Sequence, residues 1–238
     1  LSVLKTVGHL VRHRPRELFV QNPSMFLAAL ACLYGLATGH RVIVDRHTTF
    51  LLNKPPRVNL ERAVFMALHR FTIRHASLTI VTNPYLADLV RRAGGRSFVL
   101  PDPLPVLSRT STPHLEGRTN VLVISSFGED EPIEEILEAA RRLGRPDVRL
   151  YVTGNHRKGP QDWAAMAPAN VVFTGFVPVA DFVDLLFAVD AIVVLTKADH
   201  CMLCGCYEAV AAEKPLITSD KEDLKDYFAG AEFVDERP

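Results

Sequence analysis

The residues best suited to bind a ligand lie in one short segment near the end of the chain, 203–208 (LCGCYE). A strand-like run, 191–195, precedes this segment, and a helix is expected over 206–212. The first turn of a helix leaves backbone N–H groups unpaired and carries partial positive charge, so a diphosphate can bind there. Gly205 lets the backbone approach a ligand closely, and the Glu208 carboxylate could accept hydrogen bonds from ribose hydroxyls. The candidate nucleotide-binding residues of this segment are Leu203, Cys204, Gly205 and Glu208.

Two further groups of small and polar residues follow strand-like runs in the same half of the chain. Ser125, Ser126 and Gly128 follow the run 120–125 and could offer hydroxyl and backbone donors to a pyrophosphate. Gly154 to Lys158 (GNHRK) follow the run 148–153, and Arg157 or Lys158 could supply positive charge. Ligands bind at the carboxyl ends of strands in open parallel sheets, which places all these residues at one edge. Two alternatives remain open: Glu208 as a helix cap without a ligand, and Lys158 as a solvated loop lysine.

In the first half of the chain, Asp45 and His47 follow the run 41–45 (RVIVD). A carboxylate or an imidazole at the carboxyl end of a strand could serve as general base on a hydroxyl group. These two residues are therefore the candidate catalytic residues of this half. The alternative is a polar loop that caps the next helix.

A cluster of histidine and cysteine residues could in principle bind a zinc ion. His200, Cys201, Cys204 and Cys206 lie within seven residues, and thiolates with an imidazole are typical zinc ligands. Structural zinc sites usually draw on two separated ligand pairs, and Cys206 would fall inside the first helical turn. The sequence therefore predicts no metal site and favours small residues packed beneath a phosphate-binding loop. So few cysteines also form a poor disulfide framework, which indicates a reducing compartment.

Composition sets broad limits on the kind of protein. The 238 residues allow one large or two modest domains, and 27 Lys and Arg balance 27 Asp and Glu, without the basic excess of a nucleic-acid binder. No secretory signal is visible, and because the sequence opens on Leu1 we expect the true start to lie upstream. The apolar stretch 25–38 is shorter than the roughly 20 residues that span a bilayer. We expect it to be core, with a peripheral membrane contact as the alternative.

Strands and helices alternate along the whole chain, which predicts parallel sheets covered by helices. The first half has expected strands at 18–21, 41–45, 78–82 and 97–100, and helices at 5–13, 25–36, 60–75 and 84–93. The second half has expected strands at 120–125, 148–153, 170–174, 191–195 and 215–218, and helices at 132–143, 180–188, 206–212 and 223–228. A stretch rich in Pro, Ser and Thr separates them. The expected domains are 1–105 and 118–238, joined by a linker over 106–117.

The block 205–220 (GCYEAVAAEKPLITSD) resembles the donor-domain segment of GT-B glycosyltransferases, in which a Glu opens a helix and a Lys-Pro, a buried strand and an Asp follow. Upstream, VRLYVTGN and FTGFVPVADFVDLLFAVDAIVVL are similar to other parts of that domain. In the first half, LFVQNPSMFLAALACLYGLATGHRVIVDRHTTF resembles β-mannosyltransferases that act on lipid-linked sugars. The resemblance covers nearly the whole chain and is strongest in the last third.

This resemblance implies a GT-B fold, with two Rossmann-like doubly wound domains facing across a cleft and a first domain that lacks its first strand. The implied function is transfer of a sugar from a nucleotide diphosphate donor, UDP- or GDP-linked, to a hydroxyl acceptor that is lipid-linked or a polysaccharide precursor. Backbone groups around Gly175 would contact the base. His200 stands where the family has the first of two Glu residues, so it is a candidate catalytic residue that touches the donor phosphate or sugar.

We further expect no cofactor beyond the donor, no metal because no acidic motif of the DxD kind appears, and no nucleic-acid partner. We also expect a cytoplasmic protein that works at the inner face of a membrane if its acceptor is a lipid. The acidic turn 125–131 departs from the basic residues that the family carries there. Two alternative functions therefore stay open: a sugar-nucleotide 2-epimerase of the same fold, and a non-catalytic partner subunit that binds nucleotide sugars. An oxidoreductase is disfavoured because no G-x-G-x-x-G motif follows a strand.

Overall fold

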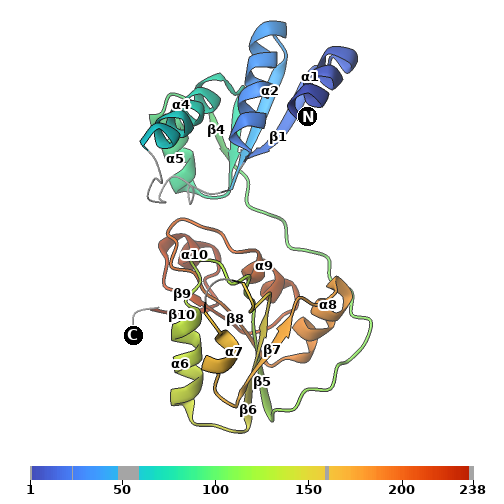
Figure 1. Cartoon of the computed structure of the whole chain (residues 1–238), viewed down its shortest axis with the longest axis vertical. Helices are drawn as coiled ribbons and strands as arrows, with labels where there is room; N and C mark the ends of the chain where they lie inside the picture. Colours follow the sequence, from blue (N-terminus) through green and yellow to red (C-terminus); the bar gives the residue numbers. More distant parts are fainter. Residues whose placement is uncertain (1, 23, 48–58, 159–160, 236–238) are drawn as a thin grey trace. The chain divides into compact units, whose positions relative to one another are not determined.

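A computed structural model describes residues 2–22, 24–47, 59–158 and 161–235. The chain divides into two compact units (Figure 1). The first unit contains Leu1–Asp102 together with His200–Met202, and the second contains Pro103–Asp199 and Leu203–Pro238. We describe each unit by itself.

The first unit is built on a four-stranded parallel sheet with the strand order β1-β2-β3-β4. Its strands are β1 (Glu17–Asn22), β2 (Arg41–Arg46), β3 (Leu78–Val81) and β4 (Ser97–Val99). Its helices are α1 (Ser2–His13), α2 (Met25–Thr38), α4 (Asn59–His75) and α5 (Pro84–Arg92). Because each strand is followed by a helix and then by the neighbouring strand, the sheet grows in one direction only.

Local sequence signals explain where these helices begin and end. Helix α2 stops at Gly39, whose left-handed backbone (φ 71°) lets its N–H bond the Gly35 carbonyl oxygen at 2.8 Å. Helix α5 starts at Asn83, whose side-chain oxygen accepts from the Leu86 N–H at 2.9 Å, and Pro84 occupies the first helical position.

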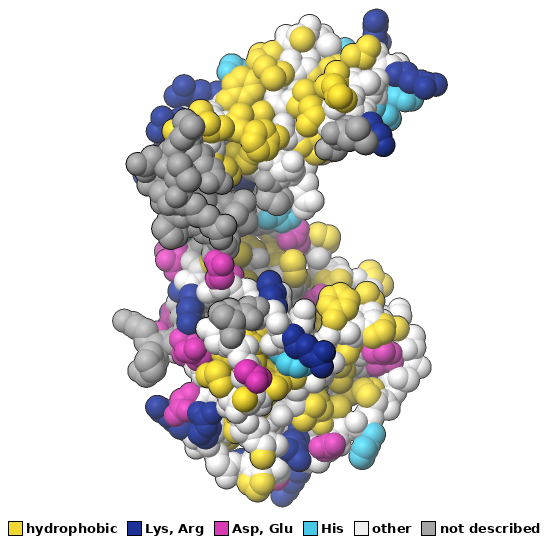
Figure 2. Space-filling model, in the orientation of Figure 1, with side chains coloured by type: hydrophobic (Ala, Val, Ile, Leu, Met, Phe, Trp, Pro, Cys, Tyr) yellow, Lys and Arg dark blue, Asp and Glu magenta, His cyan; other side chains and the backbone are white. Residues whose placement is uncertain are grey.

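The apolar stretch of α2 is partly core and partly surface. Ala28, Ala31 and Cys32 pack on Val42 and Val44 of β2. The other side of the helix leaves large apolar side chains exposed, and α1 does the same (Figure 2). These exposed side chains are Val3, Leu4, Val7, Val11, Phe26, Leu27, Leu33 and Leu36. Among the described residues, no helix is both long and apolar enough to cross a membrane.

The second unit is a six-stranded parallel sheet with the order β10-β9-β8-β5-β6-β7. Its strands are β5 (Thr119–Val123), β6 (Val148–Thr153), β7 (Val171–Gly175), β8 (Ala191–Val194), β9 (Leu216–Ser219) and β10 (Glu232–Val234). Its helices are α6 (Ile133–Leu143), α7 (Trp163–Met166), α8 (Val179–Ala188), α9 (Cys204–Ala211) and α10 (Glu222–Tyr227). The expected α/β architecture with parallel sheets is confirmed.

The strand order of this sheet reverses direction at β5. Strand β5 pairs with β6 on one side and with β8 on the other, with Val121 opposite Leu150 and Ala191. Strands β6 and β7 follow β5 in the chain and lie on one side of it. Strands β8, β9 and β10 come next in the chain and lie on the other side. Such a reversal opens a crevice at the carboxyl ends of the two central strands, where ligands bind in doubly wound sheets.

Sequence patterns found the main elements but missed two short ones, α7 and β10. Helix α9 begins at Cys204, two residues before the expected start, and β5 ends at Val123, so Ser125 lies in the loop beyond it. The part of the chain expected as a linker contains no helix or strand. It is nevertheless attached to the second unit. The Thr110 N–H and the hydroxyls of Thr110 and Ser111 donate to the Asp184 carboxylate of α8 at 2.7–2.8 Å.

Candidate functional site

The candidate nucleotide-binding residues of α9 lie where the second sheet reverses direction. Leu203 precedes the helix without a side-chain cap, and Cys204 begins it as an exposed residue. Gly205 is buried, and a Cβ there would lie 3.0 Å from both γ-methyl carbons of Val194 and 3.2 Å from Cδ1 of Ile124. The absence of a side chain at Gly205 therefore lets α9 pack tightly on the end of β8. The expected close approach of a ligand to Gly205 stays a prediction.

Glu208 lies one turn further along α9 and is half-buried. Among the residues that the structure describes, no hydrogen-bond donor or cation pairs with its carboxylate. Burial raises the pKa of Glu208 above its ordinary value, because a charged carboxylate is less well solvated there. A half-buried carboxylate without a partner is costly for the protein alone and is suited to accept hydrogen bonds from a ligand. A capping role is not seen, because the side chain bonds no backbone N–H of the described helix.

The serines after β5 bind a carboxylate of the protein itself. The Ser125 hydroxyl donates to Glu131 Oε2 at 2.5 Å, and the Ser126 hydroxyl donates to Oε1 at 2.8 Å. The Ser126 N–H lies 3.0 Å from both oxygens of the same carboxylate. These donors therefore form an anion-binding loop that Glu131 fills in this structure. Gly128 belongs to the same turn, where a Cβ would lie 2.9 Å from Asp130 Oδ1.

Contacts connect this loop to the ends of β6 and β7. A Cβ on Gly154 would lie 2.2 Å from the Ser125 carbonyl oxygen, and the Gly154 backbone is left-handed (φ 95°), so only glycine fits. The Gly154 N–H donates to the Gly175 carbonyl oxygen at 3.0 Å. Lys158 extends over the loop, with its Nζ 3.5 Å from the Ser126 carbonyl oxygen. Gly154, Gly175 and Lys158 therefore lie at the same edge as the serine loop.

His200 and the cysteines form no metal site in the described part of the chain. His200 has a left-handed backbone (φ 57°) and groups with the first unit. Cys206 is buried in α9 with its Sγ 3.5 Å from the Thr218 hydroxyl, whereas Cys204 is exposed. No group of three or more His, Cys, Asp or Glu among the described residues is arranged to hold a metal ion.

In the first unit, Asp45 and His47 form a hydrogen-bonded pair at the carboxyl end of β2. His47 Nε2 lies 2.8 Å from Asp45 Oδ2, and His47 Nδ1 lies 3.8 Å from Asp102 Oδ2. All three side chains are about one third exposed, at 32–37%. An imidazole oriented by carboxylates has the arrangement of a general base.

Sequence reasoning missed three residues of these two sites. Glu131 was noted only as part of an acidic turn, although its spacing from Ser126 allows it to fold back onto that loop. Asp102 lies far from His47 in the sequence, and nothing local joins them. His156 lies between Gly154 and Lys158 and stacks on Phe173, and its buried Nδ1 has no hydrogen-bond partner among the described residues.

Part of the chain matches the profile of a known protein family. A family profile described as glycosyl transferases group 1 matches residues 108–235. No curated protein matches the chain by sequence.

Solved structures share the fold at low sequence identity. HepE from Anabaena, in complex with UDP-glucose, is 16% identical with a TM-score of 0.75 over 98% of this chain and 68% of its own. Sucrose-phosphate synthase from Thermosynechococcus elongatus is 14% identical with a TM-score of 0.70, over 98% of this chain and 64% of its own. A protein described as a UDP-N-acetylglucosamine 2-epimerase from Listeria monocytogenes is 12% identical with a TM-score of 0.60, over 97% and 64%. The chain thus spans about two thirds of the length of these proteins.

Proposed function

Because the chain belongs to the glycosyl transferases group 1 family, we propose that it transfers a sugar from a nucleotide diphosphate donor to a hydroxyl acceptor, and that the second unit binds the donor. Both units have the parallel α/β architecture of GT-B glycosyltransferases. In this reaction the bond from the anomeric carbon to the diphosphate breaks, and a bond from that carbon to the acceptor oxygen forms. The diphosphate leaves with the electron pair, and the acceptor hydroxyl gives up its proton.

The observation that carries the proposal is the Glu208 carboxylate, which pairs with no residue in the described part of the chain. It lies half-buried in the first turns of α9, beside the reversal of the strand order, and no described residue compensates its charge. Ribose hydroxyls are donors that would do so. The diphosphate would then lie at the start of α9, where backbone N–H groups and the helix dipole favour negative charge.

The serine loop after β5 and Lys158 would serve the same diphosphate. The loop already binds a carboxylate through two hydroxyls and one N–H, so its geometry suits an anion. A phosphate would have to displace Glu131, and Lys158 would offset its charge. We propose that Glu131 holds the loop in shape until the donor arrives.

For the acceptor, the Asp45–His47 pair is our candidate general base. The imidazole would take the proton of the acceptor hydroxyl, and Asp45 would stabilise the imidazolium that forms. We propose a sugar or a lipid-linked sugar as acceptor, in keeping with the resemblance of the first half to β-mannosyltransferases.

A thermal-shift screen tests the donor proposal directly. A ligand that binds only the folded protein raises its melting temperature. UDP, GDP, ADP and their sugar conjugates would be compared, beginning with UDP-glucose because HepE was solved with it. A folded protein that responds to none of them would contradict the proposal.

Product analysis then separates transfer from epimerisation. Incubation with UDP-N-acetylglucosamine and no acceptor would yield a new sugar nucleotide only from a 2-epimerase. Formation of a glycosylated acceptor, with release of the nucleotide diphosphate, supports transfer.

A further inference from the structure

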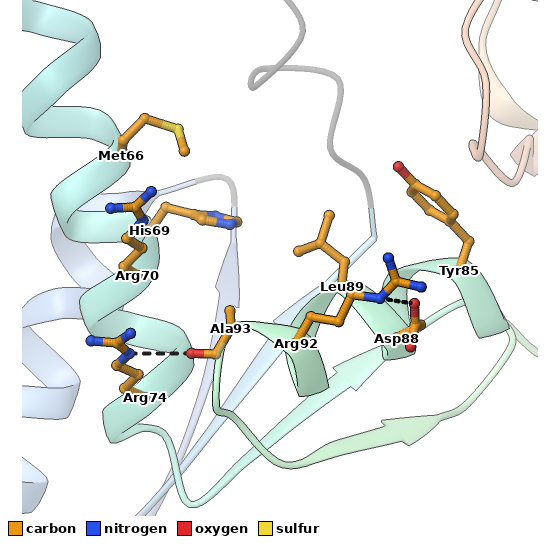
Figure 3. A pocket seen from close by; sticks show the side chains of 9 residues that line it. All are labelled: Met66, His69, Arg70, Arg74, Tyr85, Asp88, Leu89, Arg92 and Ala93. Carbon is orange, nitrogen blue, oxygen red and sulfur yellow. Dashed lines mark hydrogen bonds and ion pairs between the residues drawn. The ribbon is translucent and has the colours of Figure 1, made fainter.

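A groove of about 530 Å³ lies between α4 and α5, entirely within the first unit. We call it the α4–α5 groove and define it by His69, Arg70 and Arg74 of α4 with Leu89 and Arg92 of α5 (Figure 3). Its volume falls within the range of about 300–1,000 Å³ typical of small-molecule sites. No residue of this groove was singled out from the sequence, and the proposed function does not use it.

At the floor of the groove, His69 presents a hydrogen-bond donor that pairs with none of the residues described by the structure. The side chain is only 4% exposed, and its ring extends from α4 toward α5 (Figure 3). His69 Nδ1 lies 2.9 Å from Arg46 Nη1. A guanidinium can only donate, so Nδ1 is the acceptor and the ring proton is on Nε2. Among the described residues, nothing accepts a hydrogen bond from Nε2.

Arg46 holds His69 in this tautomer. Arg46 is 2% exposed, and its guanidinium also lies 3.5 Å from the Thr72 hydroxyl. When the Asn22 amide is oriented with its oxygen toward Arg46, that oxygen accepts hydrogen bonds from both Nη atoms of the guanidinium at 3.0–3.1 Å. Burial and the charge of Arg46 lower the pKa of His69 to about 4, so the ring is neutral near pH 7. Within the described part of the chain no carboxylate pairs with Arg46, which leaves the positive charge behind His69 uncompensated.

The rim of the groove adds further positive charge. Arg92 pairs with Asp88 at 2.6 Å, and Arg74 Nε donates to the Ala93 carbonyl oxygen at 3.2 Å. Arg70 is exposed and has no ion-pair partner among the described residues. The groove therefore carries three arginines against one aspartate. The wider surroundings have the same sign, since residues 1–102 contain 14 Lys and Arg and 5 Asp and Glu.

We propose that the α4–α5 groove binds a phosphate ester carried by the acceptor, with His69 Nε2–H and Arg70 donating to the phosphate oxygens. The proposal rests on the proposed function, in which the first unit receives the acceptor. Met66 and Leu89 line the same groove and offer apolar surface to the rest of the ligand. A sugar phosphate and a lipid phosphate share this chemistry, and the test distinguishes them.

The test is calorimetric titration of the whole chain at constant ionic strength, without nucleotide. The probes are glucose 6-phosphate, glucose and geranyl phosphate. The wild-type protein should bind at least one of the two phosphate esters and should not bind glucose. Because the titration contains no nucleotide, its result is independent of donor binding. Tighter binding of glucose 6-phosphate indicates a soluble acceptor, and tighter binding of geranyl phosphate indicates a lipid acceptor.

Two matched variants locate the site. Arg70→Gln removes a groove cation at an exposed position and should weaken phosphate-ester binding about tenfold or more, as expected for a charge-assisted hydrogen bond. Arg91→Gln removes the same charge from α5 at an exposed position outside the groove, and should leave binding unchanged. In addition, the ¹⁵N resonance of His69 Nε2 should shift when the phosphate ester is added to the wild-type protein.

Equal weakening by the two variants would overturn the proposal, because it would mean that the phosphate responds only to overall charge. Absence of binding by both phosphate esters would overturn it as well. So would a His69 Nε2 resonance that does not move at saturating ligand.

Discussion

The substitution Glu208→Gln tests the proposed donor site with the least change in shape. The two side chains have nearly equal volumes, so α9 should keep its packing on β8. What changes is the charge at a half-buried position that no described residue compensates. The variant is therefore expected to change donor affinity and apo stability in opposite directions.

The expected loss of affinity follows from the hydrogen bonds that the carboxylate would accept. A hydrogen bond to a charged group contributes about 1.5–3 kcal/mol, more than a neutral pair. Gln keeps one acceptor oxygen, so the variant loses one charged hydrogen bond to the ribose. Since about 1.4 kcal/mol corresponds to a tenfold change in affinity, the Kd for UDP should rise about 10- to 100-fold.

The apo protein should become more stable near neutral pH. The pKa of Glu208 is raised by burial in the folded state, so its favourable contribution to folding is present at low pH. That contribution is lost as the pH rises through the folded pKa. Gln does not titrate, so the melting temperature of Glu208→Gln should exceed that of the wild type at about pH 7 and approach it at acidic pH.

The assay combines calorimetric titration of UDP with melting curves over the same pH range. Glu213→Gln is the matched control, because Glu213 is an exposed carboxylate in the turn after α9. It should change neither quantity. An unchanged UDP affinity in Glu208→Gln would remove this residue from the site. A lower melting temperature with unchanged affinity would show that Glu208 stabilises the helix.

Three further substitutions test the architecture around this site. Gly205→Ala would bring a methyl group against Val194 and should destabilise the fold by about 1–3 kcal/mol, measured by urea unfolding; wild-type stability would refute the tight packing of α9 on β8. Glu131→Gln removes the anion that fills the serine loop and should lower the Kd for UDP, whereas an increase would show that Glu131 is needed in the bound state. Asp184→Ala should free the segment around Thr110 to proteolysis, while Asp181→Ala should not. Hydrogen bonds from Ser111 and Thr110 hold the pKa of Asp184 well below its usual range. The stability that Asp184 contributes should therefore be lost only as the pH falls through this lowered pKa. Acid unfolding curves of the wild type and Asp184→Ala test this pH dependence.

Much of the fold could be predicted because its signals are local. Strand β2 contains a central run of β-branched residues (VIV), and α2 ends at Gly39, where the left-handed backbone favours glycine. Alternation of such elements was enough to predict parallel sheets. Short elements such as α7 and β10 escaped detection, because four or three residues carry too little pattern.

The candidate site was predictable only in part. The residues that follow strands were found because the carboxyl edge of a parallel sheet follows from the order of its elements. Their partners were not found. Glu131 in the serine loop, Asp102 beside His47 and Arg46 behind His69 are side-chain pairings, and a pairing depends on rotamers and helix packing as well as on position in the chain.

By itself, the amino-acid sequence determined the alternating elements, the α/β class and the residues at the strand ends, because hydrophobic periodicity and turn-forming residues act over a few positions. Only the tertiary structure decided which of those residues have partners. It showed that no described residue pairs with Glu208, that the serine loop already holds a carboxylate, and that a buried arginine orients His69 in a basic groove. The physical reason is that burial and charge compensation arise from residues brought together over tens of positions, such as Arg46 and His69 or Thr110 and Asp184.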